Sequence, residues 1–376
     1  MFRVALGKNP HVPASTGLGS YTPTSLVWRS EAIGGDHSAE AEFLFADPIE
    51  ALSFAETALL SSFEVSDDSG DLLWGGYVVS AEIRMGGFSA VVSAEAFATR
   101  LYFHYTDPAA RVQAKIIVDD SNTNLPADLR KEIRNAQNVW GIWDRVIVGT
   151  EMPLGVAELA AQTAWRQFSR IRMAFRSVDL GTWSQEASVR VQALGYWSIL
   201  RRRVFLHYDP TAMDFADFIR LVVERCAVTR LGDNLLVWAR PGRIDRTGAL
   251  TVPYSEDTTI YAADLIERKM QATYFGDKIV LPSMRGVFYE VALTDVRDLI
   301  YIDTRGQRVF GSPGEIPLWK VRAGSLARVS MFPSVPDDPV LVMRAEYSAE
   351  SNSLRLETSL ANRLDVMIAN FGLRGT

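Results

Sequence analysis

Residues 63–98 read FEVSDDSGDLLWGGYVVSAEIRMGGFSAVVSAEAFA, and this stretch decides the fold class. Apolar and polar residues alternate along much of it, and turn formers at 67–70 and 86–87 divide it into three runs, 63–65, 72–82 and 88–98. Strand-forming runs joined by short glycine turns are typical of antiparallel hairpins. The stretch therefore predicts a β-meander.

The strand signature returns along the rest of the chain. Residues 1–46 are rich in proline and glycine and predict short strands with a flexible leading arm. Further strands are expected at 170–178, 187–194, 234–240, 277–281, 286–294, 339–347 and 353–358, with a turn at 348–352 between the last two.

Helical periodicity interrupts this pattern. Asp47, Pro48 and Glu50 form a capping sequence that predicts a helix ending near Ser61. Apolar residues at helical spacing predict further helices at 125–140, 154–168, 214–226 and 262–271, with the clearest periodicity in 214–226.

Composition and charge exclude several classes of protein. The chain has 376 residues and a net charge of -6, and its only dense basic run is 201–203, which we interpret as a solvated or interface edge. A nucleic-acid-binding protein normally needs a basic face, so specific DNA binding is not expected. With Cys226 as the only cysteine, no intrachain disulfide forms. No apolar run reaches about 18 residues, so no membrane-spanning helix is expected, and the N-terminus does not look like a signal peptide.

Residues with catalytic or ligand-binding chemistry have simpler structural interpretations. Cys226 lies on the apolar face of its predicted helix, where core packing is favoured. Acidic residues at 67–71 and 119–120 lack a calcium-loop pattern and are expected in solvated turns. Trp140 and Trp143 are expected to pack rather than to bind sugar. The chain is therefore predicted to be no enzyme and to need no cofactor or metal.

Two segments of the chain are similar in sequence and form an internal repeat. Residues 91–108 and 189–210 each carry an alternating strand, an aromatic residue, then His-Tyr and Asp-Pro. The residues of this repeat are Phe97, His104, Tyr105, Asp107 and Pro108 in the first segment, and Tyr196, Trp197, His207, Tyr208, Asp209 and Pro210 in the second. The histidines could serve as catalytic bases, but structural corner hydrogen bonds at strand ends are favoured. The repeat predicts two related barrels.

The predicted fold is therefore β-rich α+β, with two related antiparallel β-barrel domains, helical insertions and extended arms. Residues 1–108 form the N-terminal β-barrel domain with its leading arm, and 109–168 form a mixed helical insertion. Residues 169–310 form the second β-barrel or α+β domain. A Pro-rich connector and the C-terminal strands that complete a barrel occupy 311–376.

Three motifs resemble minor tail proteins of long-tailed bacteriophages. They are the hairpin spanning 64–79, the run LGYWSIL at 194–200, and the C-terminal runs 344–347, 354–356 and 364–366. The similarity is to the tail-tip or baseplate hub family, which is related to hub domains of type VI secretion spikes. This chain departs from the family in having no long spike or fibre extension after the barrels.

The resemblance implies a structural virion protein at the phage tail tip, assembled in the host cytoplasm. It implies a homotrimer in which two barrels per chain adapt the hexameric tail tube to a threefold tip and let DNA pass. The implied partners are the tail tube, distal tail, tape measure and spike or fibre proteins. Two alternatives stay open: a distal tail protein forming a hexameric ring, and a carbohydrate-binding or carbohydrate-cleaving β-barrel module.

Overall fold

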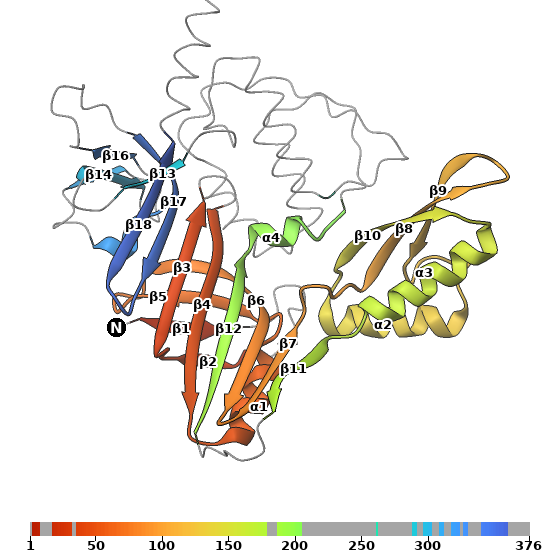
Figure 1. Cartoon of the computed structure of the whole chain (residues 1–376), viewed down its shortest axis with the longest axis horizontal. Helices are drawn as coiled ribbons and strands as arrows, with labels where there is room; N and C mark the ends of the chain where they lie inside the picture. The colour runs from red at the N-terminus through yellow and green to blue at the C-terminus, as the bar shows by residue number, and fades with distance from the viewer. Residues whose placement is uncertain are drawn as a thin grey trace, which may run out of the picture.

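A computed structural model describes residues 2–7, 17–31, 35–178, 186–204, 261, 288–291, 296–302, 308–311, 317–323, 326–329 and 340–359. These residues form one large antiparallel sheet and a smaller three-stranded sheet with two helices (Figure 1). The β-rich α+β class is confirmed. The large sheet is open, and no closed barrel forms among the residues the structure describes.

The large sheet contains fifteen strands. Its main path runs β15-β14-β16-β17-β3-β4-β12-β6-β5-β1-β2, with β7 and β11 attached beyond β6 and β13 and β18 attached beyond β17. The strands are β1 (Arg3–Leu6), β2 (Gly19–Tyr21), β3 (Ser25–Glu31), β4 (Gly35–Phe45), β5 (Ser62–Ser66), β6 (Leu72–Met85), β7 (Phe88–Ser93), β11 (Arg172–Val178), β12 (Ala187–Gly195), β13 (Phe288–Val291), β14 (Val296–Ile302), β15 (Arg308–Gly311), β16 (Leu326–Val329), β17 (Val340–Ser348) and β18 (Ser353–Ser359).

The meander expected at 63–98 is present as β5, β6 and β7. β6 pairs with β5 along its first half and with β7 along its second half, while β12 pairs along its other edge. Strand β12, which the sequence repeat places in a second barrel, instead lies between β4 and β6 in the same sheet. The β7 and β12 strands of the sequence repeat flank β6 on opposite edges.

One face of this sheet forms the main core. Alternate residues of β4, β6 and β12 pack there against helix α1 (Pro48–Ala58), which contributes Phe54 and three buried alanines. Asp47 caps α1 as expected, because its carboxylate accepts a hydrogen bond from the Ile49 amide at 2.8 Å. Phe2 packs edge-on against Trp28, Trp319 and Tyr347, so the start of the described chain is held against this core.

A separate small α/β unit projects from the large sheet (Figure 1). It comprises β8 (Arg100–Asp107), β9 (Val112–Val118), α2 (Ala127–Trp140), β10 (Asp144–Glu151) and α3 (Leu154–Phe168). β8 lies in the middle, antiparallel to β9 and parallel to β10. The two helices cover one face and bury Phe103, Ile133 and Trp165 in a second core. Both helices were expected from their periodicity; β8 was expected to close the first barrel and instead belongs to this unit.

The remaining described elements are α4 (Trp197–Leu200) and the 3-10 helix η2 (Leu318–Lys320). Several predicted elements lie outside the described residues: the helices 214–226 and 262–271, the strands 234–240 and 277–281, and Cys226. Between residues 204 and 288 the structure describes Tyr261 alone. The predicted domain boundaries stay a prediction. In the described part of the chain, no helix has both the length and the apolar character needed to cross a bilayer.

Candidate functional site

The face of the large sheet opposite α1 carries charged side chains. Because side chains alternate along a strand, residues 80, 82 and 84 of β6 and 190 and 192 of β12 share this face. Ion pairs connect the side chains along and between the strands. They are Arg84–Glu82 (3.1 Å), Arg176–Glu82 (3.6 Å), Arg190–Glu40, Arg29–Glu346, Arg344–Glu31 (3.1 Å) and Arg344–Glu357 (3.4 Å). This face is therefore polar and close to balanced in charge.

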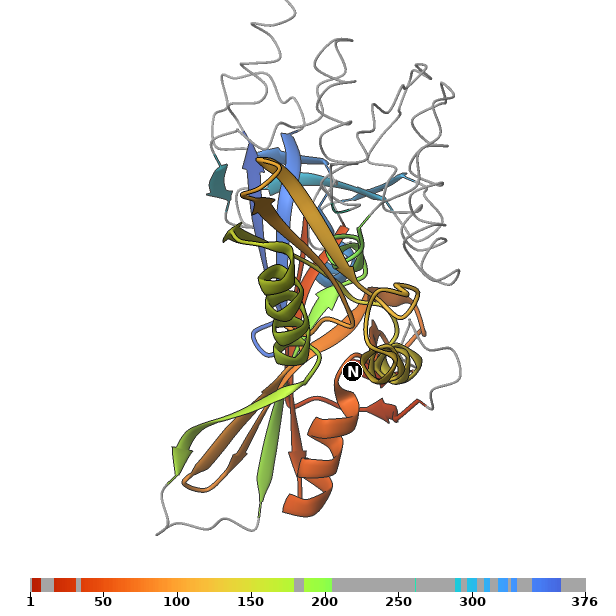
Figure 2. The same cartoon turned by 90° about the vertical axis from the view of Figure 1, so that its right-hand side faces the viewer.

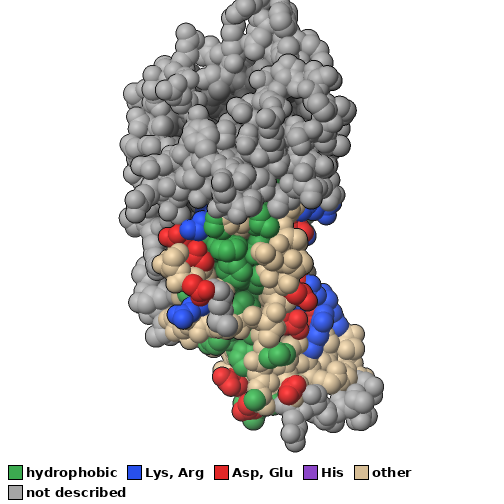
Figure 3. Space-filling model, turned by 90° about the vertical axis from the view of Figure 1, so that its left-hand side faces the viewer, with side chains coloured by type: hydrophobic (Ala, Val, Ile, Leu, Met, Phe, Trp, Pro, Cys, Tyr) green, Lys and Arg blue, Asp and Glu red, His purple; other side chains and the backbone are tan. Residues whose placement is uncertain are grey.

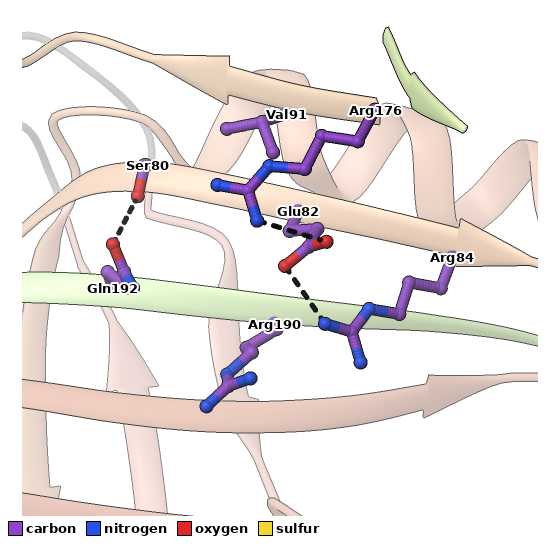
Figure 4. Close-up of a pocket in the computed structure, with 7 residues that line it drawn as sticks. All are labelled: Ser80, Glu82, Arg84, Val91, Arg176, Arg190 and Gln192. Carbon is purple, nitrogen blue, oxygen red and sulfur yellow. Dashed lines mark hydrogen bonds and ion pairs between the residues drawn. The ribbon is translucent and has the colours of Figure 1, made fainter. Parts of the chain in front are cut away.

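A pocket of about 160 Å³ lies on this face where β6, β7, β11 and β12 meet. Figure 4 shows the guanidinium groups of Arg84 and Arg176 approaching Glu82 from two sides, with Arg190 beside them. The lining residues are Ser80, Glu82, Arg84, Val91, Arg176, Arg190 and Gln192. The pocket thus brings three arginines around one carboxylate.

The electrostatics of the pocket keep Glu82 ionised. Burial raises the pKa of this carboxyl, but hydrogen bonds from Arg84 and Ser89 and the charge of Arg176 outweigh burial and lower it overall. Glu82 is shared by two guanidinium groups that remain about half exposed or more. Arginine presents a planar fork of donors that fits carboxylates and phosphates. The site is therefore suited to recognising an acidic group rather than to proton transfer.

Strand β11 forms the rim of this site. All seven of its residues are exposed, and among the described strands it pairs only with β7. Its apolar side chains Met173, Phe175 and Val178 are 55%, 60% and 60% exposed. A sheet edge that exposes both its backbone and apolar side chains is a typical site of protein association.

The first segment of the repeat lies mainly in the small α/β unit. Phe97 is buried against Trp140, with ring centroids 5.9 Å apart, and Tyr105 is buried in the second core. Asp107, followed by Pro108, ends β8, and its carboxylate accepts from the Ala109 amide at 2.9 Å.

His104 lies inside β8 rather than at its end, paired across to Val148 and Lys115. Its Nε2 atom is buried and has no hydrogen-bond partner. Burial, with a smaller contribution from Lys115, lowers the pKa of this imidazole. We find no corner hydrogen bond at this atom.

The second segment of the repeat is described as far as Val204. Tyr196 follows β12 and is buried, with its hydroxyl 3.3 Å from Glu64, and Trp197 begins α4. Residues His207, Tyr208, Asp209 and Pro210 lie outside the described residues, so the equivalence of the two His-Tyr corners stays a prediction.

The acidic turn at 67–71 is held by the protein itself. One Asp67 oxygen accepts from the amides of Ser69 and Asp71, at 3.0 Å each, and Lys320 lies 2.7 Å from the Asp71 carboxylate. The turn is therefore tied to η2. At 119–120, Gln137 donates to Asp119 and Arg134 pairs with Asp120.

The basic run 201–203 lies at the junction between the large sheet and the small unit, where two of its side chains make contacts within the chain. The Arg202 guanidinium lies 4.4 Å above the Trp143 ring and donates to the Phe97 carbonyl. Arg203 donates to the Ile142 carbonyl at 3.1 Å. Their side chains are used within the chain, so the expectation of a solvated or interface edge is wrong for these two arginines.

The residues of the pocket were not singled out from the sequence. The available signal was the alternation of charged and apolar residues in 80–85 and 188–193, which predicts a polar sheet face. The sequence does not reveal that Arg176, nearly a hundred positions beyond Glu82, meets it through the pairing of β11 with β7.

Fold and site together define a β-rich α+β chain with a charged, open sheet face and an exposed edge strand. No protein-family model and no curated protein sequence matches it. Among solved structures, it aligns with "the tail protein from Neisseria meningitidis MC58" at a TM-score of 0.36 and 7% identity, covering 95% of this chain and 96% of that chain.

Proposed function

We propose that this chain is a non-enzymatic structural protein of a bacteriophage tail, which forms a trimeric hub ring at the tail tip. The observation that carries the proposal is that the described strands of the three motifs resembling tail proteins, which are scattered over the sequence, belong to one sheet. Motifs that pack against one another support the resemblance to tail proteins more strongly than motifs that lie apart in the fold.

Two of these motifs are in direct contact. Gly195, in the second motif, pairs with Gly76 of the β5–β6 hairpin, and Ser198 donates to the Tyr77 hydroxyl at 3.0 Å. The Tyr196 ring lies over Gly75, 3.3 Å from the place of a β-carbon there. Gly75 therefore makes room for the Tyr196 ring, and Gly76 allows the close approach of the β12 backbone at Leu194.

The third motif is connected to the others through the sheet. Its described part forms the β17–β18 hairpin, in which Tyr347 pairs with Leu354. β17 also pairs with β3, placing Tyr347 beside Trp28, and β3 leads through β4 to β12. The turn at 349–352 lies where it was expected.

A tail-tip ring gives these features a function. Open sheet edges and a charged face are surfaces that a closed ring of identical chains can bury. In the proposed assembly the chain contacts the tail tube, distal tail, tape measure and spike or fibre proteins, and its acidic net charge lets DNA pass without binding.

Copy number tests the proposal. Native mass spectrometry and electron microscopy of tails that contain the full chain are expected to show three copies in a ring at the tip. Six copies would instead identify a distal tail ring protein. A chain that is absent from tail particles and binds glycans on an array would overturn the proposal in favour of a carbohydrate-binding module.

A further inference from the structure

The exposed end of the small α/β unit combines apolar and acidic side chains. We define the tip as residues 107–112 and 151–159, which are the β8–β9 turn and the start of α3 with the residues before it. Glu151 pairs with Thr106 at the end of β8, and the Met152 amide donates to the Thr106 carbonyl at 3.0 Å. These contacts bring the two parts of the tip together.

Large apolar side chains on the tip are open to solvent. Leu154 and Leu159 are 53% and 66% exposed, and Val112 and Val156 are also more than half exposed. Exposed apolar residues are ordinary when they are single, but a group at the end of a projecting unit indicates a contact surface.

The tip is also acidic. Asp107, Glu151 and Glu158 outnumber Arg111 there. Asp107 and Glu158 lie near the same tyrosine, because both contribute to raising the pKa of Tyr105, after burial as the main cause. The tip therefore carries acidic groups from both of its parts.

Strand β11 presents the opposite charge on one of its faces and apolar side chains on the other. Arg172 and Arg176 lie on the pocket face of this strand, whereas Met173 and Phe175 point to the other face, and the strand carries no acidic residue. Arg176 also lines the pocket, where it shares Glu82 with Arg84. A carboxylate of a partner that approaches Arg176 would also meet the guanidinium group of Arg84 beside it.

The two surfaces lie at different ends of the molecule. The small unit projects to one side of the large sheet, whereas β7 and β11 extend away from it at the lower end of the sheet (Figures 1 and 2). A surface and its complement at separate places on one chain give a head-to-tail contact, which forms a ring when the rotation closes. Another side of the molecule shows a band of apolar side chains between charged groups (Figure 3).

We infer that the partner of β11 is a second copy of this chain, whose acidic tip docks on the strand. Glu151 and Glu158 of one copy then face Arg172 and Arg176 on the pocket face of the next. This inference rests on the proposed function, since it names the contact that builds the ring.

Charge reversal tests the contact in the full chain. The basic-side variant carries Arg172→Glu and Arg176→Glu, and the tip variant carries Glu151→Arg and Glu158→Arg. Because each creates like charges across the contact, each is expected to weaken self-association by about tenfold or more in sedimentation velocity. The chain with all four substitutions restores opposite charges and is expected to assemble as the wild type does.

The control is Arg134→Glu, which breaks an exposed ion pair with Asp120 on α2, outside both surfaces. Unfolding midpoints establish that each variant folds, and recovery in the four-substitution chain excludes misfolding as the cause of lost assembly. The inference is overturned by a wild-type chain that stays monomeric, by single-side variants that assemble normally, or by no recovery in the four-substitution chain. A variant that still forms tail-tip rings refutes this contact but leaves the proposed function intact.

Discussion

Arg100 and Asp144 form a two-pronged ion pair where the small α/β unit joins the large sheet. Arg100 Nε lies 2.6 Å from Asp144 Oδ1, and its Nη2 lies 2.9 Å from Oδ2. The Asp144 side chain is fully buried and also accepts from the Val204 amide at 2.7 Å. Because β8 starts at Arg100 and β10 starts at Asp144, the pair aligns the two parallel strands and holds the chain that leaves α4.

Removing one partner of this pair is expected to be costly. Arg100→Ala leaves the Asp144 carboxylate buried without its main counter-charge, which lowers the free energy of unfolding by about 3–5 kcal/mol. Urea unfolding followed by tryptophan fluorescence measures the change. Arg134→Ala, which removes an exposed pair, is the matched control and is expected to cost at most about 1 kcal/mol. Equal losses in the two variants would contradict the prediction.

A glycine substitution tests the close contact between β4 and β12. A β-carbon at Gly195 would overlap the Asp36 carbonyl oxygen, whereas a β-carbon at Gly155 in α3 would meet nothing within 4 Å. Gly195→Ala is therefore expected to lower the unfolding midpoint sharply or to abolish soluble expression. Gly155→Ala should be neutral or stabilise the helix by about 0.5–1 kcal/mol. Similar behaviour of both variants would show that β4 shifts to accommodate the methyl group.

The aromatic cluster around Phe2 gives a third prediction. The ring of Phe2 lies 5.4 Å from that of Trp28 and 5.7 Å from that of Trp319, so it connects β3 to η2. Phe2→Ala is expected to lower the free energy of unfolding by about 1–3 kcal/mol, because apolar burial and edge contacts are lost. Limited proteolysis should then cleave near η2 faster. An unchanged cleavage rate would show that Phe2 does not hold η2 in place.

Local patterns in the sequence predicted the local structure well. The capped start of α1, the periodicity of α2 and α3, and the glycine turns of the meander all act over a few residues, and each element formed close to its expected bounds. The open sheet was not predicted, because the placing of β12 between β4 and β6 depends on pairing between residues more than a hundred positions apart. The repeat suggested two barrels because similar strands were assumed to lie in separate units, whereas β7 and β12 share β6 as a neighbour.

The candidate site was less predictable than the fold. Arg176 meets Glu82 only because β11 returns to β7 after the whole small unit. The sequence predicts a solvated basic edge at Arg202 and Arg203. It does not indicate that the Arg202 guanidinium stacks on Trp143 or that Arg203 donates to a backbone carbonyl. In both cases the charged groups are matched by residues that are distant in sequence, and composition alone does not show such partners.

The last prediction concerns the buried carboxyl of Asp36. It accepts a hydrogen bond from the Gly75 amide at 2.8 Å, while its other oxygen is buried without a hydrogen-bond partner. Burial is the main cause that raises the pKa of Asp36 to about 6, and the nearby Arg322 and the Gly75 hydrogen bond offset only part of it. The folded chain therefore binds this proton more tightly than the unfolded chain does.

The sign of the pH dependence follows from this shift. The unfolded value is 3.8, so protonation of Asp36 favours the fold at low pH, and that contribution is lost as pH rises from about 4 through about 6. Asp36→Asn removes the titrating group. Between about pH 4 and pH 6, the free energy of unfolding of the wild type is expected to fall relative to that of the variant by up to about 3 kcal/mol. Urea unfolding at several pH values between 4 and 7.5 measures it. Asp36→Ala, which also lacks the carboxyl, should show the same pH dependence at a lower overall stability. Parallel curves for the wild type and both variants would mean that Asp36 does not titrate in this range.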